Sequence, residues 1–288
     1  MANDDKISSV ARKKRTVLIT GCSDGGLGSA LAIALRETGL HVYATARNPS
    51  KLAQVQAHGI ETFTLDVLSP ESISAAVTKV THLDMLVNNA GALYSMPITD
   101  MSIPQAKELF DLNVWSYLAM TQAFLPRLLE SKGIVVNQTS SAGLTPIAFQ
   151  SAYNASKAAM IMFSDCMRLE LAPLGIRVVD LKSSNASSNN FSNNLGAKLP
   201  AGSLYAVARD TVERVMRGET FPMEVTAEQW AKQVARDLLK KDTPPANIWR
   251  GTKAGVAWLS SIRPFALPEG LLKKLAGLDV VERAVSKQ

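Results

Sequence analysis

Cysteine and histidine are scarce in this chain of 288 residues, which has two cysteines and three histidines. Cys22 and Cys166 stand too far apart for a metal-binding motif, and one isolated pair gives no disulfide framework, so a reducing compartment is expected. His41, His58 and His82 are too scattered for a metal site, and nothing supports a catalytic histidine. We therefore expect no bound metal.

Long apolar runs are absent as well. No apolar stretch reaches the roughly eighteen residues that cross a membrane, and residues 1–15 lack the apolar core of a signal peptide. We expect a cytoplasmic protein, either free or peripheral on a cytosol-facing membrane or lipid droplet.

The formal charge is +6, but four of its positive charges form the run 12–15, which is typical of a solvated tail. No interleaved aromatics or motif predict nucleic-acid binding.

Apolar residues make up 47% and charged residues 19% of the chain, which suits a large buried sheet. Short β-branched runs alternate with longer helical patterns, and this alternation predicts βαβ units. The fold class is therefore α/β: a Rossmann-type, doubly wound parallel sheet of about seven strands with helices on both faces, in a single domain. Its strands are expected at 16–20, 41–46, 61–65, 85–87, 133–137, 177–181 and 246–249.

The domain is predicted to span 16–260, after a disordered basic tail at 1–15 and before a helical extension at 261–288. The longest helical patterns cover 104–130, with a kink expected at Pro126, and 152–172, which ends before Pro173 and Gly175. Further helical patterns cover 203–218 and 227–241. The Ser/Asn-rich stretch 183–194 between them predicts a mobile loop.

The first predicted strand runs directly into TGCSDGGLGSALA. Gly21, Gly26 and Gly28 allow a tight turn and a close approach of backbone to a pyrophosphate at a helix N-terminus. A glycine-rich turn by itself is a weak signal, but its place between a β-branched strand and an Ala/Leu-rich helix favours a phosphate site.

Arg47 ends the second strand, at a position where an NAD-binding fold usually has a carboxylate. A guanidinium there is able to pair with the 2′-phosphate of NADPH, so the position favours NADPH. An ordinary surface arginine is the alternative.

Tyr153 and Lys157 lie one turn apart in the helical pattern 152–172, so they share a face. A neighbouring ammonium stabilises a phenolate and lowers the tyrosine pKa toward the range of a general acid. Such a pair is more often an exposed helix face than a catalytic one. Ser140, thirteen residues before Tyr153 and just after a strand, adds a hydroxyl at the edge where a cofactor is expected.

Together these motifs resemble the ordered signature of the short-chain dehydrogenase/reductase family. The resemblance covers residues 16–182 and rests on TGCSDGGLG, Asn88-Asn89-Ala90-Gly91, Asn113 in FDLNVWS, Ser140, and Tyr153 with Lys157.

The resemblance implies a role for each catalytic residue. Tyr153 would protonate a carbonyl oxygen as hydride arrives from the nicotinamide, and Ser140 would hydrogen-bond the same oxygen. Lys157 would hold the nicotinamide ribose, and Asn113 would support a proton relay through water. By the same resemblance the cofactor-binding set is Gly21, Ser23, Gly26, Leu27, Gly28, Arg47, Asp66, Asn89, Gly91, Tyr153, Lys157, Ser183 and Ser184. For Asp66, next to the expected adenine, a turn carboxylate is the competing interpretation.

Two features depart from the family pattern. Four residues, rather than three, separate Gly21 from Gly26; this spacing resembles a fungal branch that includes the NADPH-dependent acyl-dihydroxyacetone-phosphate reductases. Ser183-Ser184 replaces the Pro-Gly or Thr-Gly that shapes the nicotinamide pocket, and serine lacks the backbone freedom of glycine.

The C-terminal stretch also resembles that fungal branch. An apolar stripe of Leu271, Leu272, Leu275 and Leu278 is flanked by Lys273, Lys274 and Arg283. Core packing or a dimer contact is the first interpretation of this stripe, and binding to an anionic membrane is the second.

We therefore expect an NADPH-dependent oxidoreductase that reduces a lipophilic or secondary-metabolite ketone or aldehyde, and that pairs into a homo-oligomer as the family often does. The alternative is a non-reducing family member that retains NADP(H) as a binding scaffold or acts as a cyclase or isomerase.

Overall fold

The computed structural model describes residues 14–189, 194, 196, 198–240, 243–262, 269–275 and 277–285. Most of the predicted basic tail, residues 1–13, lies outside the described residues. Among the described residues, no helix combines the length and the apolarity needed to cross a lipid bilayer.

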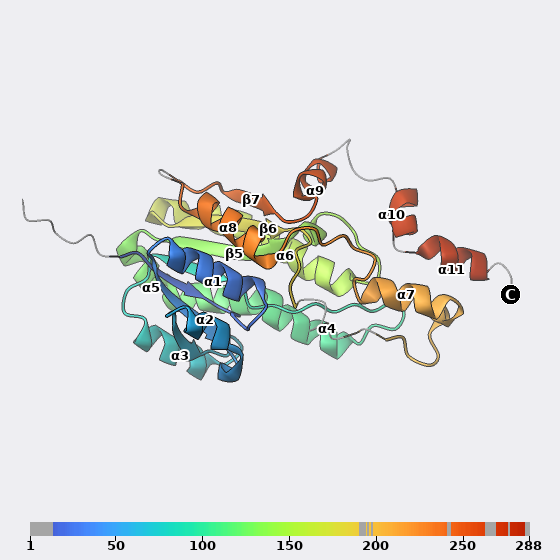
Figure 1. Ribbon diagram of the computed structural model, residues 1–288, viewed down its shortest axis with the longest axis horizontal. Coiled ribbons are helices and arrows are strands. Elements are labelled where there is room, and N and C mark those ends of the chain that lie inside the picture. Colours follow the sequence, from blue (N-terminus) through green and yellow to red (C-terminus); the bar gives the residue numbers. More distant parts are fainter. Residues whose placement is uncertain are drawn as a thin grey trace, which may run out of the picture.

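A seven-stranded parallel sheet forms the centre of the molecule (Figure 1), with strand order β3-β2-β1-β4-β5-β6-β7. The order reverses between β1 and β4, and such a switch point opens a crevice at the carboxyl ends of the strands. The predicted fold class and its strands are confirmed. The strands are β1 (Thr16–Ile19), β2 (His41–Ala46), β3 (Glu61–Thr64), β4 (Met85–Asn88), β5 (Ile134–Ser140), β6 (Arg177–Ser183) and β7 (Asn247–Arg250).

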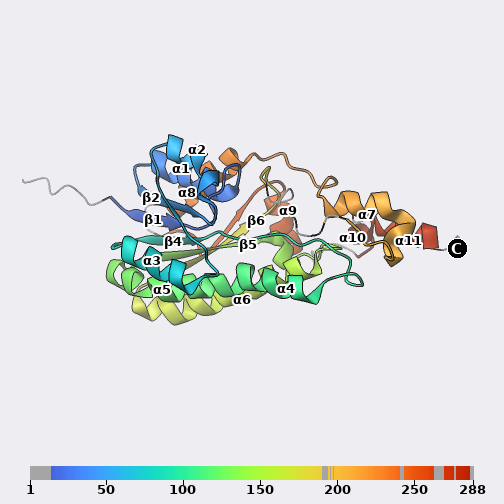
Figure 2. The same ribbon diagram turned by 90° about the horizontal axis from the view of Figure 1, so that it is seen from below.

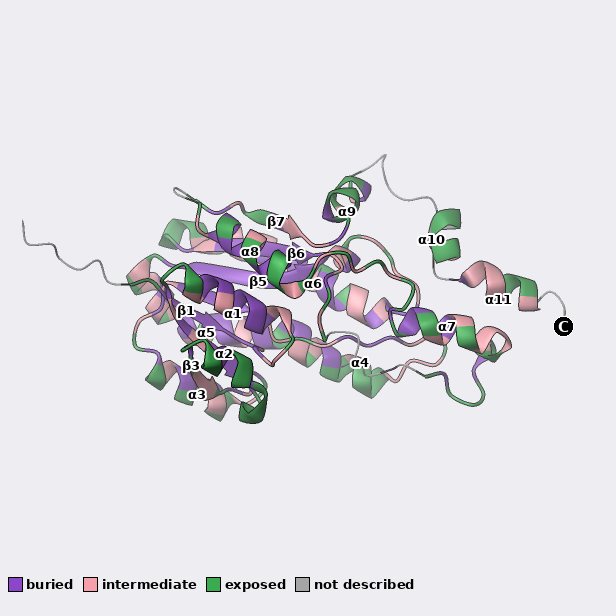
Figure 3. Cartoon of the chain, in the orientation of Figure 1, coloured by how far each residue is buried: buried purple, intermediate pink, exposed green. Residues whose placement is uncertain are grey.

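Helices cover both faces of the sheet (Figure 2). One face packs on α1 (Leu27–Glu37), α2 (Ala53–Ala57) and α8 (Ala227–Leu238), and the other on α3 (Pro70–Lys79), α5 (Ser116–Ser131) and α6 (Ser151–Leu171). The inner strands β1, β4, β5 and β6 are almost wholly buried between these layers, whereas the edge strands β3 and β7 are partly exposed, as Figure 3 shows by colour. A sheet buried on both sides explains why its strands appear in the sequence as continuous apolar runs.

The long helix predicted at 104–130 is interrupted by a turn that the sequence did not indicate. α4 (Ile103–Phe110) passes into a π-helical turn, Asp111–Trp115, and then into α5, which continues through Pro126. The kink expected at Pro126 stays a prediction. The π turn coincides with Asn113, whose buried side chain is bonded to the backbone of Ala92. π turns of this kind are frequent at functional sites.

The polar stretch after β6 is a loop, as predicted, but its described part is tied down. Asn185 and Ser187 form isolated bridges to Thr252 and Thr226, and Asn189 donates from Nδ2 to the carbonyl oxygen of Asp24 over 2.8 Å. The bridges hold the first part of the loop to the segments that precede α9 and α8, and Asn189 holds its end to the glycine loop, so residues 185–189 are more constrained than their composition predicts. Residues 190–193 lie outside the described residues.

The C-terminal extension does not form one apolar stripe. Gly277, at φ +67°, separates α10 (Glu269–Leu275) from α11 (Leu278–Val285), so Leu275 and Leu278 belong to different helices. α11 packs against α7 (Arg209–Met216), whereas Leu275 is 54% exposed on α10. The prediction of a single stripe failed because a left-handed glycine turns the chain. The side chain of Leu272 lies outside the described residues.

A further helix, α9 (Ala254–Ser260), follows β7 directly before this extension.

Candidate active site

A cavity of about 330 Å³ opens at the carboxyl edge of the sheet, at the ends of strands β1 to β6. Of the fifteen residues predicted for the site, Gly28 and Asn113 do not line it. The other thirteen do: Gly21, Ser23, Gly26, Leu27, Arg47, Asp66, Asn89, Gly91, Ser140, Tyr153, Lys157, Ser183 and Ser184.

The glycine loop is shaped by close backbone contacts. Gly21 has φ +72°, and a Cβ there would lie 2.7 Å from the Cα of Ala90. A Cβ on Gly28 would lie 2.4 Å from Nδ2 of Asn89 and 2.5 Å from the carbonyl oxygen of Gly21. That amide of Asn89 donates to the carbonyl oxygens of Thr20 and Gly21, at 2.8 and 2.9 Å. Gly28 and Asn89 therefore fix the shape of the loop without lining the cavity at Gly28. α1 begins at Leu27, which does line the cavity, so the N-terminus of this helix faces the space where a phosphate would bind.

The two residues predicted at the adenosine end stand where β2 and β3 finish. Arg47 is exposed and follows Ala46, the last residue of β2. Oδ1 of Asp66 accepts from the backbone N–H of Leu68 over 3.0 Å, which is the turn role that the sequence left open. Asp66 also lines the cavity, and its role next to the adenine stays a prediction.

Lys157 lies at the inner wall of the cavity, 4% exposed. Its Nζ donates to the backbone carbonyl oxygen of Gln138 over 2.9 Å and lies 5.8 Å from the ring centre of Tyr153, which is half-buried. Burial lowers the pKa of Lys157 to about 8, and the negative charge of buried Asp180 on β6 partly opposes this. An ammonium of this kind, one helical turn from a tyrosine, is able to stabilise a phenolate.

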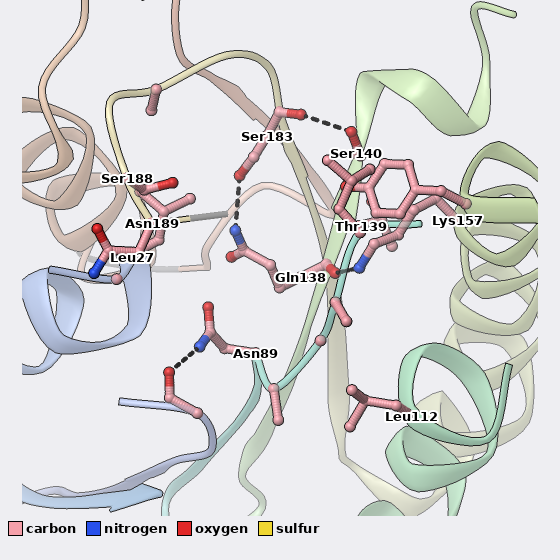
Figure 4. Close-up of a pocket in the computed structure, with 18 of the residues that line it drawn as sticks. Leu27, Asn89, Leu112, Gln138, Thr139, Ser140, Lys157, Ser183, Ser188 and Asn189 are labelled. Atoms are coloured by element: carbon pink, nitrogen blue, oxygen red, sulfur yellow. Dashed lines mark hydrogen bonds between the residues drawn. The ribbon is translucent and has the colours of Figure 1, made fainter. Parts of the chain in front are cut away.

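Ser140 ends β5 with its side chain engaged at both sides. Its Oγ donates to the carbonyl oxygen of Ser183 over 3.2 Å (Figure 4). The same Oγ accepts from the N–H of Ala142 over 3.1 Å. The register pairs Ser140 directly with Ser183 on β6. A small rotation of the hydroxyl would direct its hydrogen into the cavity while the Ala142 bond is kept.

Asn113 is fully buried and lies behind the cavity wall. Its Oδ1 accepts from the N–H of Ala92 over 2.9 Å, and its Nδ2 donates to the carbonyl oxygen of Ala92 and to Oγ of Ser156. A Cβ on Gly91 would come within 3.0 Å of Oδ1. Its side chain thus fixes the segment after β4, and the relay role implied by the resemblance stays a prediction.

Ser183 and Ser184 point to different partners. Oγ of Ser183 accepts from Nε2 of Gln138 over 3.0 Å, whereas Oγ of Ser184 donates to the carbonyl oxygen of Thr252 over 2.8 Å. Gly251 has φ +120°, and a Cβ there would lie 2.6 Å from the carbonyl oxygen of Ser184. The second serine therefore fastens the loop to the β7–α9 connection, and the first belongs to the cavity wall.

Sequence reasoning missed several lining residues. Gln138 was hidden inside a strand pattern, and the loop after β6 offered no signal of which residues fold back over the glycines. The polar lining residues that were missed are Asp24, Gln138, Thr139, Ser141, Gln150, Asn185, Ser188 and Asn189. Within the part of the chain that the structure describes, no group of three His, Cys, Asp or Glu side chains is arranged to hold a metal ion.

Residues 15–196 match the short chain dehydrogenase family. The chain belongs to the short-chain dehydrogenase/reductase family. It is an oxidoreductase of that family, and the resemblance to fungal members is confirmed by its relatives. A short-chain dehydrogenase/reductase of Pestalotiopsis microspora is 51% identical over 276 residues, which cover 94% of this chain and 97% of that protein.

Two further proteins place this short-chain dehydrogenase/reductase among its relatives. The NADPH-dependent 1-acyldihydroxyacetone phosphate reductase of Schizosaccharomyces pombe is 34% identical over 291 residues, covering 93% of this chain and 97% of that protein. The crystal structure of a short-chain dehydrogenase from Streptomyces avermitilis superposes with a TM-score of 0.75 at 26% identity, covering 95% of this chain and 98% of that one.

Proposed function

We propose that this short-chain dehydrogenase/reductase uses NADPH to reduce the carbonyl group of an uncharged, lipophilic ketone or aldehyde, with Tyr153 as the proton donor. The observation that carries the proposal is the position of Lys157. Its ammonium is held by β5 within the cavity, one turn from Tyr153, in the same wall as Ser140.

The cavity fits a dinucleotide phosphate. The glycine loop leaves no room for a Cβ at Gly21 or Gly28, and the N-terminus of α1 behind it suits a pyrophosphate. Arg47, at the end of β2, presents a guanidinium where a 2′-phosphate would lie. The similarity to a reductase named as NADPH-dependent supports the same choice.

Each catalytic residue of the chain has a separate role in the reduction. Bound NADPH supplies the hydride. Tyr153 gives its phenolic proton to the developing alkoxide, and the Lys157 ammonium stabilises the phenolate that remains. Ser140 donates a hydrogen bond to the same oxygen and orients the carbonyl.

The substrate end of the cavity carries apolar side chains and little charge. Leu93, Ile147 and Phe221 line it, and the charged lining residues are Asp24, Arg47, Asp66 and Lys157. Of these, Asp24, Arg47 and Asp66 are loop or strand-end residues beside the glycine loop and β2–β3. The loop sequence 183–197 contains no charged residue. Lys157 is the one cation near Tyr153 among the lining residues that the structure describes, and its ammonium is already bonded to the carbonyl oxygen of Gln138. A substrate phosphate would find no second cationic partner there, which favours an uncharged carbonyl compound.

The test follows NADPH absorbance with a panel of apolar ketones and aldehydes, including one phosphate-bearing ketone. We expect oxidation with apolar carbonyls, and a loss of 10² to 10⁴ in rate in Tyr153→Phe with NADPH binding retained. Tyr43→Phe, on β2 away from the cavity, is the matched control.

Two results would contradict the proposal. One is a wild type that binds NADPH yet oxidises it with no carbonyl, which would favour a scaffold, cyclase or isomerase. The other is a Tyr153→Phe variant with unchanged activity.

A further inference from the structure

Gln138 is a buried polar residue of β5 that the roles above leave unexplained. Its side chain is 6% exposed and lines the cavity, and Figure 4 shows its amide reaching from β5 into the space between Ser183 and Asn89. Nε2 donates to Oγ of Ser183 over 3.0 Å. Among the residues that the structure describes, Oε1 has no hydrogen-bond partner.

A buried amide oxygen without a partner is costly. Leaving such a group unpaired destabilises a fold by roughly 1–3 kcal/mol, and most buried polar atoms are paired for that reason. The preceding β5 residues Val135 and Val136 show that apolar side chains suit this strand. An unpaired oxygen in the wall of a ligand cavity is accounted for when the ligand brings the missing donor.

Ser183 complements Gln138. Its hydroxyl accepts from Gln138, and the hydroxyl hydrogen has no acceptor among the described residues. The pair therefore offers one acceptor, Oε1 of Gln138, and one donor, the hydroxyl of Ser183. A primary carboxamide offers the reverse: an NH₂ donor and a carbonyl acceptor.

We propose that Gln138 and Ser183 bind the carboxamide of the nicotinamide. This inference rests on the proposed use of NADPH. Oε1 of Gln138 accepts from the carboxamide NH₂, and Ser183 donates to its carbonyl oxygen. Two side chains thus do what the Pro-Gly or Thr-Gly backbone does in the family pattern from which Ser183-Ser184 departs. Since the carboxamide marks one edge of the ring, holding it fixes which face of the ring is turned toward Tyr153.

The competing explanation is that Gln138 only braces the end of β6. Removing the side chain would then weaken every ligand of the cavity equally. A ligand that lacks the NH₂ group separates the two explanations. The 3-acetylpyridine analogue of NADP carries a methyl group in place of the NH₂ and keeps the carbonyl oxygen.

The experiment measures the dissociation constants of NADP and of this analogue by titration calorimetry, for the wild type and for Gln138→Met. Methionine keeps the length of the side chain and removes both polar atoms. We expect the wild type to bind NADP about tenfold more tightly than the analogue, and Gln138→Met to bind both alike. Gln105→Leu, which replaces an exposed glutamine on α4, is the control and should keep the tenfold preference.

If circular dichroism shows that Gln138→Met does not fold, Ser183→Ala takes its place. This variant should bind both NADP and the analogue more weakly than the wild type does, because both ligands keep the carbonyl oxygen.

The outcomes are distinguishable. Equal affinity of the wild type for NADP and the analogue overturns the carboxamide proposal and leaves the NADPH assignment intact. A preference that persists in Gln138→Met overturns it as well, as does a Ser183→Ala variant that binds both ligands as the wild type does. A wild type that binds neither ligand defeats the proposed function itself.

Discussion

Lys157 is fastened to β5 by a hydrogen bond from its Nζ to the carbonyl oxygen of Gln138, over 2.9 Å. The side chain of the same Gln138 bonds to Ser183, and the carbonyl oxygen of Ser183 accepts from Ser140. The ammonium, the serine hydroxyl and the wall of the cavity therefore form one connected unit across β5, β6 and α6. This connection explains how a long, flexible lysine is held at a fixed place beside Tyr153.

The burial of Lys157 predicts a pH-dependent cost in stability. The pKa of Lys157 is lowered by burial to about 8 in the folded chain, from 10.5 for an unperturbed lysine. Between these values the unfolded state binds the extra proton, so stability rises with pH through this window. The penalty, about 3 kcal/mol, is fully present below pH 8 and is gone above pH 10.5.

Lys157→Met removes this dependence. Urea unfolding from pH 7 to 10.5 should show the wild type gaining about 3 kcal/mol relative to the variant. Cys22 and Tyr117, whose pKa values are raised by burial, titrate in both proteins, and their contributions cancel in the difference. A difference that stays flat across this range would contradict the prediction.

Arg47→Asp should weaken NADPH binding about 30-fold, or about 2 kcal/mol, because a charge-assisted pair is lost and a repulsion is added. NADH binding should be unchanged or improved, since its ribose carries no 2′-phosphate. Dissociation constants of both cofactors provide the measurement. Lys107→Asp, on the exposed face of α4, is the matched charge reversal and should leave both constants unchanged. Equal affinity of the wild type for NADH and NADPH would remove the basis of the assignment.

Gly28→Ala should destabilise the protein and impair dinucleotide binding together. The new Cβ would lie 2.4 Å from Nδ2 of Asn89 and 2.5 Å from the carbonyl oxygen of Gly21, so the glycine loop must shift. Overpacking of this kind costs roughly 1–3 kcal/mol, which lowers Tm by a few degrees. At Gly255 on α9 no atom lies within 4 Å of a Cβ, so Gly255→Ala should leave Tm unchanged or raise it. Similar melting of the two variants would show that the loop tolerates the methyl group.

The sheet was predictable from sequence for a local reason. Parallel strands buried on both faces leave continuous apolar runs, and their carboxyl ends meet at one edge. Ser140 follows such an end, whereas the choice of Tyr153 and of most other site residues rested on the resemblance to the ordered motifs of the family.

Features that depend on distant partners could not be predicted. Gln138 stands in a run of strand residues, and its role depends on Ser183, 45 residues further on. The π turn at Asp111–Trp115 contains Asn113, whose hydrogen-bond partner Ala92 lies 21 residues earlier in the chain, so no local pattern marks it. These are long-range effects that residue periodicity does not carry.

Ser140→Ala should lower kcat far more than it lowers stability or cofactor affinity. The hydroxyl is needed when negative charge develops on the carbonyl oxygen, and loss of one such donor costs about 10² to 10³ in kcat. The folded chain loses the acceptor of the Ala142 N–H, which costs about 1 kcal/mol. The measurement is kcat and KM for the best carbonyl of the panel, with the dissociation constant of NADPH and Tm determined alongside. Ser141→Ala, the adjacent lining residue, is the control and should retain near-normal kcat. If Ser140→Ala instead kept kcat and raised KM for every carbonyl tested, the hydroxyl would be binding the substrate without stabilising its transition state.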